Sequence, residues 1–198
     1  METRPQRAAQ HPAKHKERSR RVLRPLDARR LDEMAVAYVA RFATSAAKLD
    51  AYLRRKLRER GWEDQDDPPL AAIVAKCVAA GYVDEAAFAH AKSGALLRRG
   101  YGMRRIGEAL GAAGVAEPLR REVRASAGAR IQRNAALAMA RKRRFGPFGP
   151  GELDRASREK QVGALLRAGH PLDSARELVN AASIEAAENW AAQPDGDE

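Results

Sequence analysis

The chain has 198 residues, enough for one core of ordinary size or a row of small ones, and its apolar content of 44% excludes wholesale disorder. A single cysteine excludes an internal disulfide. No signal-peptide pattern and no membrane-spanning run is found, so we expect a cytoplasmic protein without a membrane partner. The formal net charge of +11 favours a polyanionic partner, above all nucleic acid. The alternative is an arginine and alanine bias imposed by a GC-rich genome.

The apolar residues are mostly alanine and leucine, which favours helices over strands, and we predict an all-α fold. Residues 1–30 show no apolar period and hold ten lysines or arginines among Pro5, Pro12 and Pro25. They predict a disordered basic arm, a solvated tail in preference to a weak phosphate binder. At the other end, residues 191–198 are expected to form an acidic, frayed tail.

Residues 31–82 are predicted to form the first three-helix unit. An apolar stripe with helical spacing begins at Leu31 and marks the first helix. The second helix is capped by Thr44 or Ser45 and ends at Gly61. An acidic, proline-bearing link then precedes a third, strongly apolar helix.

Residues 83–127 are predicted to form the second unit. Asp84 caps its first helix, and residues 98–102 form a basic, glycine-bearing corner before the next helix. That helix contains Gly107 and Gly111, each costing about 1 kcal/mol relative to alanine. Their presence predicts a closely packed neighbour, and a short basic helix closes the unit.

Residues 128–190 are predicted to form the third unit. A long helix runs to Arg144, and the sequence FGPFGPG at residues 145–151 cannot continue it, so an exposed corner is expected there. The chain is helical again from Glu152 to Gly169, and one last helix follows.

The second helix of each unit repeats one spacing of apolar residues and glycine. The positions are Leu53, Leu57 and Gly61, then Ile106, Leu110 and Gly114, then Gln161, Leu165 and Gly169. The glycines lie 53 and 55 residues apart, as expected for a repeat architecture, although Gln161 stands where the other copies are apolar. The pattern predicts three tandem three-helix repeats.

No catalytic, metal or cofactor site is predicted. Cys77 belongs to the apolar stripe of its helix, and the acids at residues 63–67 fit a flexible, solvated link better than a magnesium site. No phosphate-binding glycine motif is present. The histidines are scattered; they are His11, His15, His90 and His170. We therefore expect a protein that binds and is not an enzyme.

Four segments, in order, resemble the RecX family of bacterial recombination regulators. They are SAAKLDAYLRRKLRERGW, GYVDEAAFA, RRGYGMRRIGEALGAAGV and REKQVGALLRAGHPLDSARELV. The resemblance implies tandem three-helix repeats in an elongated, curved module. It further implies a monomer that binds the RecA recombinase and its DNA filament and inhibits ATPase and strand exchange, in DNA repair and the SOS response. Where the family commonly has Asp-Asp, this chain has Asp84 and Glu85.

Clusters of arginine at helix ends and corners are the candidate binding residues for RecA or DNA, because they can present several guanidinium groups together. They are Arg98, Arg99, Arg104 and Arg105 at the central corner, Arg141, Lys142, Arg143 and Arg144 at the last corner, and Arg54, Arg55 and Arg58 on the second helix. The alternative for each cluster is a solvated face. Direct contact with single- or double-stranded DNA stays open.

A helix-turn-helix transcription regulator is the second hypothesis, because tight glycine turns between short helices also occur in that fold. No predicted helix is rich in base-reading residues, and no dimerisation stripe is found. An inert scaffold is the third hypothesis.

Overall fold

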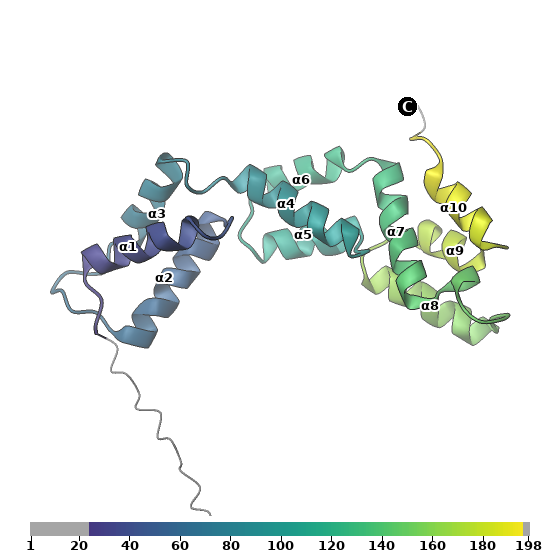
Figure 1. Ribbon diagram of the computed structural model, residues 1–198, viewed down its shortest axis with the longest axis horizontal. Coiled ribbons are helices and arrows are strands. Elements are labelled where there is room, and N and C mark those ends of the chain that lie inside the picture. The colour runs from purple at the N-terminus through teal and green to yellow at the C-terminus, as the bar shows by residue number, and fades with distance from the viewer. Residues whose placement is uncertain (1–23, 196–198) are drawn as a thin grey trace, which may run out of the picture.

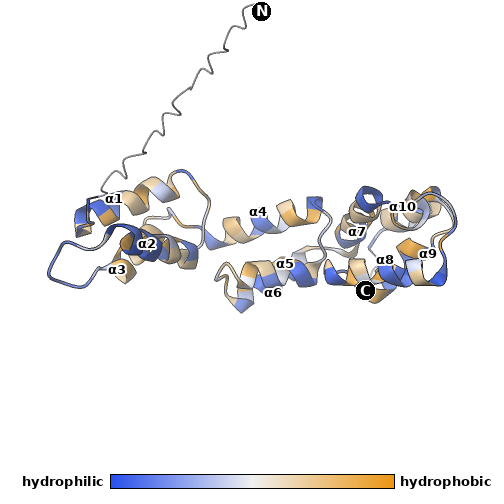
Figure 2. Cartoon of the chain, turned by 90° about the horizontal axis from the view of Figure 1, so that it is seen from below, coloured by the Kyte–Doolittle hydropathy of each residue, from blue (hydrophilic) through white to orange (hydrophobic). Residues whose placement is uncertain are grey.

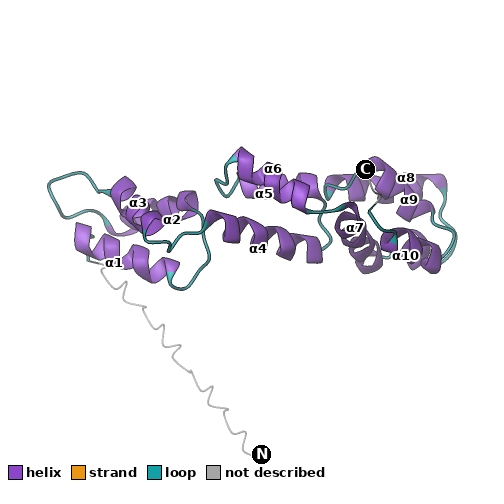
Figure 3. Ribbon diagram, turned by 90° about the horizontal axis from the view of Figure 1, so that it is seen from above, coloured by secondary structure: helices purple, strands orange, loops and turns teal. Residues whose placement is uncertain are grey.

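The computed structural model describes residues 24–195, which form ten α-helices and one short 3-10 helix. The helices lie in an elongated row of three units (Figure 1). Loops alone join them, and no strand occurs among the described residues (Figure 3). The predicted all-α row of repeats is confirmed. The predicted basic arm falls mostly on residues 1–23, outside the described part of the chain.

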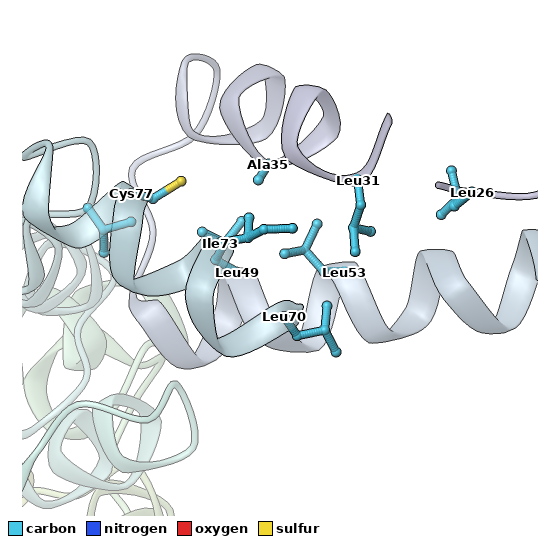
Figure 4. Packing of buried hydrophobic residues seen from close by; sticks show 9 residues of the cluster. Leu26, Leu31, Ala35, Leu49, Leu53, Leu70, Ile73 and Cys77 are labelled. Carbon is cyan, nitrogen blue, oxygen red and sulfur yellow. The ribbon is translucent and has the colours of Figure 1, made fainter. Parts of the chain in front are cut away.

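The first unit consists of α1 (Ala28–Val39), α2 (Ala46–Arg60) and α3 (Leu70–Ala79). Figure 4 shows their shared core, which contains Leu26, Leu31, Ala35, Leu49, Leu53, Leu70, Ile73 and Cys77. Leu26 is fully buried, and its backbone N–H donates to Gly61 O at 3.0 Å. Residues 24–30, predicted as the end of the arm, are therefore part of this unit, because the core needs Leu26.

The acids of the link after α2 are exposed, as predicted for a solvated segment, and two of them contact the start of α1. The carboxylate of Asp64 accepts from the N–H of Ala28 at 2.9 Å, and Glu63 pairs with Arg30 at 3.0 Å. The indole N–H of Trp62 donates to the carbonyl of Asp66 at 2.6 Å. These contacts join the link after α2 to the first turn of α1.

The second unit consists of α4 (Glu85–Arg98), α5 (Met103–Gly111) and α6 (Glu117–Ser126). Its core gathers the apolar faces of all three helices around Ile106 and Leu110. The close neighbour predicted from Gly107 and Gly111 is a pair of side chains from α6. A Cβ on Gly111 would lie 2.7 Å from Arg120 Nη1, and one on Gly107 would lie 3.3 Å from Arg124 Nη2. The glycines thus make room for guanidinium groups.

The third unit consists of α7 (Ala129–Arg143), η1 (Gly146–Phe148), α8 (Arg155–Arg167), α9 (Leu172–Asn180) and α10 (Ile184–Ala192). The single last helix that we predicted is wrong. Two helices stand there, because α9 ends at Asn180 and α10 begins at Ile184. Ser183 caps α10 by accepting from the N–H of Ala186 at 3.0 Å. This extra helix packs on α7. Figure 2 shows hydrophobic and hydrophilic segments alternating along the helices, as expected when each helix buries one face.

The FGPFGPG corner is exposed as predicted only at Pro150 and Gly151, whereas residues 145–149 are packed against the third unit. Gly146 is buried at a φ of 53°, with Leu178 O beside it, and Phe145 and Phe148 pack against the core. The side-chain oxygen of Gln161 accepts from Gly146 N at 2.7 Å. A leucine could not bind this buried N–H, which explains why Gln161 departs from the apolar pattern.

Candidate functional site

The joint between the second and third units brings main chain directly against main chain. Gly102 N donates to Ala168 O at 2.9 Å, and Arg104 N donates to Gly169 O at 3.4 Å. A Cβ on Gly102 would overlap the backbone of Gly169 and lie 2.6 Å from His170 N. Only glycine permits this approach.

His170 lies buried in this joint, with 4% of its surface exposed, and its Nε2 is 2.9 Å from Gly100 O. Burial lowers the pKa of His170, and the hydrogen bond to the Gly100 carbonyl opposes that shift only in part. Sequence analysis left His170 unassigned. The available signal was its place directly after the stop glycine, where the second unit has buried Val115.

The joint between the first and second units depends on side chains. Ser45 Oγ donates to Ala113 O at 2.5 Å, and Ala46 N donates to Glu85 Oε1 at 3.3 Å. Asp84 caps α4 by accepting from the N–H of Ala87 at 2.8 Å. The two acids therefore have separate contacts, one within α4 and one across the joint.

At the central corner, Arg104 and Arg105 are exposed, but both have an acidic partner within the chain. Both pair with Glu108, at 2.8 Å and 3.1 Å, respectively. Arg104 also donates to Leu166 O at 2.5 Å and so ties α5 to α8. Arg104 thus contributes to the joint between the second and third units, independently of any binding partner.

The other two arginines of this corner are exposed and make no ion pair within residues 24–195. Arg98 ends α4, and Arg99 lies with its guanidinium carbon 5.6 Å from the ring centroid of Tyr101. They directly precede Gly100, which approaches α7 so closely that a Cβ on it would lie 2.9 Å from Met139. The two charges therefore lie beside the joint between the second and third units.

At the last corner, Arg141 pairs with Glu188 of α10. Lys142, Arg143 and Arg144 are exposed and have no carboxylate partner among the described residues. Arg144 adopts left-handed backbone angles, φ 56° and ψ 49°, and ends α7. These three cations remain available to a partner.

On α2, Arg54 pairs with Asp50 at 2.7 Å and Arg55 with Glu59 at 3.6 Å. Arg58 is exposed and makes no ion pair in the described part of the chain. The three candidate clusters thus come from three different units or joints. Figure 1 places α2 in a different part of the row from α5 and α7, so the α2 cluster is separate from the other two.

The described residues offer few side chains arranged for metal binding or nucleophilic chemistry. No group of three or more histidine, cysteine, aspartate or glutamate residues in range 24–195 could hold a metal ion. Cys77 is buried, and burial raises the pKa of its thiol. No helix within this range has the length and apolar content needed to cross a membrane.

Comparison with known proteins relates most of the chain to a regulatory protein. The chain is 30% identical over 177 residues to "Regulatory protein RecX" of Myxococcus xanthus (strain DK1622), covering 85% of this chain and 94% of that protein. No protein-family model matches the chain.

Two solved structures share the fold. RecX from Lactobacillus salivarius aligns with a TM-score of 0.59 and 14% identity, over 76% of this chain and 93% of that one. A second crystal structure, of regulatory protein RecX, aligns with a TM-score of 0.59 and 16% identity, over 76% of this chain and 70% of that one.

Proposed function

This chain belongs to the RecX family, and from that premise we propose that it regulates the RecA recombinase. It binds RecA and the filament that RecA forms on DNA, and it lowers the ATPase and strand-exchange activities of that filament. It acts as a monomer in the cytoplasm, in DNA repair and the SOS response. The regulation is by binding, without chemistry of its own.

The observation that supports this proposal is the relationship to a RecX protein along 85% of the chain. The elongated row of units supports it, since such a shape can lie along a filament groove and contact several subunits (Figure 1). Free cations at the two corners would meet carboxylates or phosphates of the filament.

Among the candidate residues, we propose those without an internal partner as the main contacts. They are Arg98, Arg99, Lys142, Arg143, Arg144 and Arg58. Arg54, Arg55, Arg104, Arg105 and Arg141 are already held by acids of the chain, so a partner would have to compete for them.

The test is a titration of the protein into RecA that hydrolyses ATP on single-stranded DNA. The wild-type protein should suppress ATP hydrolysis at less than one molecule per RecA subunit. The double variant Arg98→Glu, Arg99→Glu should need about tenfold more protein for the same effect, because it reverses two charges at the contact. The matched control is Arg155→Glu, Arg158→Glu, which makes the same charge change on exposed residues of α8.

Two results would count against the proposal. If wild type in excess leaves hydrolysis unchanged and does not bind the filament, the regulatory function is wrong. If the Arg98, Arg99 variant inhibits as well as the control variant, the function stands and the central corner is not the contact. Strong preference of the protein alone for one duplex sequence would favour the transcription-regulator hypothesis.

A further inference from the structure

A pocket of about 400 Å³ lies between the end of α7 and α8, and three of its lining residues are cations. Arg143, Lys160 and Arg167 contribute three cations, and Phe145 contributes an aromatic ring. None of the described residues that line the pocket is acidic, and none of the three cations forms an ion pair within residues 24–195.

The pocket exists because the third unit packs differently from the first. Counted back from the stop glycine, Ser157 and Gln161 hold the places of Leu49 and Leu53. In the first unit these leucines are fully buried in the core that α1 and α2 share. In the third unit α7 lies mainly against α9 and α10. The corresponding face of α8 is therefore left open, and polar residues line it.

The open face of α8 is ordered along one side of the helix. Ser157 precedes Lys160 by three residues and Gln161 by four, and Arg167 follows Lys160 by seven, about two helical turns, so all four lie on the same side. Gln161 is fixed by its hydrogen bond from Gly146 N at 2.7 Å. That bond also holds the corner that presents Phe145 to the pocket. The cations and the ring are thus held on a packed frame.

Three cations around a half-buried aromatic ring suit a ligand that combines phosphate groups with a flat ring. Guanidinium and ammonium groups bind phosphate oxygens through charge-assisted hydrogen bonds, and an aromatic face stacks on a nucleobase. The volume lies within the range of about 300–1,000 Å³ that is usual for small-molecule sites.

We propose that this pocket binds a nucleotide, with its phosphates held by Arg143, Lys160 and Arg167 and its base against Phe145. The site requires no recombinase and goes beyond the regulatory function proposed above. The same chemistry is offered by a free nucleoside diphosphate and by a nucleotide unit of single-stranded DNA.

The experiment measures binding to the protein alone, by fluorescence anisotropy at low salt, with two probes. One is ADP with a fluorescent methylanthraniloyl group, and the other is a fluorescein-labelled oligothymidylate. The test variant is Lys160→Ala, Arg167→Ala, and the matched control is Arg155→Ala, Arg158→Ala on the same helix. Neither control residue lines the pocket. Circular dichroism checks that each variant keeps its helices.

We expect the Lys160, Arg167 variant to bind about tenfold more weakly or worse, with the control near wild type, because charge-assisted hydrogen bonds to phosphate are lost. If the variant loses affinity for the ADP probe, the ligand is a free nucleotide. If it loses affinity for the oligonucleotide only, the ligand is single-stranded DNA. The proposal is overturned if neither probe binds, or if the test and control variants bind alike. RecA is absent, so failure here leaves the proposed function untouched.

Discussion

Gly102 shows how a single missing side chain can fix the relation between two units. Its backbone and that of Gly169 approach so closely that a Cβ on either would overlap the other segment. The spacing pattern identified Gly169 as a helix stop, because it repeats Gly61 and Gly114. It did not identify Gly102 as a joint, because that contact joins residues from different units and leaves no local period.

Replacing Gly102 with alanine should destabilise the protein by about 1–3 kcal/mol, the usual cost of forcing extra volume into a packed site. The measurement is urea unfolding followed by circular dichroism. Gly94→Ala is the control, since it meets only the end of the Arg98 side chain at 3.4 Å. Within α4 that change should be neutral or stabilise the helix by up to about 1 kcal/mol. Equal stability of the Gly102 variant and wild type would contradict the close approach.

At the scale of elements, helix existence was predictable and helix ends were less so. The apolar stripes located the helices because each buries one face. The start of α1 moved from Leu31 to Ala28, since Asp27 caps it by accepting from the N–H of Arg30 at 2.7 Å. The split between α9 and α10 was missed, although Ser183 is a common capping residue.

The corner between α7 and α8 tests the role of the departure at Gln161. Gln161→Leu restores the apolar pattern but removes the acceptor for Gly146 N. Leaving that buried N–H without a partner should cost about 1–3 kcal/mol of unfolding free energy, offset in part by leucine burial. Thermal unfolding measures the change, and Gln161→Glu, which keeps an acceptor oxygen, is the control. If Gln161→Leu is more stable than wild type, the hydrogen bond does not hold the corner.

For the whole molecule, composition and repeat spacing predicted the all-α row, while the basic clusters remain predictions. Each unit has its own core, so the units could be recognised one at a time. Which arginines are free could not be predicted, because their acidic partners are set by helix faces and by contacts between elements. Arg141, for example, pairs with Glu188 of a helix that was not anticipated as a separate element.

The joint between the second and third units should make stability depend on pH through His170. Burial lowers the pKa of His170 in the folded protein, whereas the unfolded value is about 6.5. Its contribution is complete above the unfolded pKa and is lost as pH falls toward the folded pKa, since the unfolded chain then binds the proton first.

The melting temperature of wild type should therefore fall more between pH 7.5 and pH 5.5 than that of His170→Gln, which offers Gly100 O a donor that does not titrate. Carboxylates titrate in both proteins, so the difference between them isolates His170. Equal declines in the two melting temperatures would show that this histidine does not titrate on unfolding.

The joint between the first and second units and the joint between the second and third units should differ in how well they tolerate substitutions during evolution. The second joint rests largely on backbone contacts, which side-chain substitutions leave in place, although Arg104 and His170 add side-chain hydrogen bonds to it. The first joint depends on the side chains of Ser45 and Glu85, which one codon change can remove. Divergence among relatives should therefore reorient the first unit more readily than it separates the second from the third.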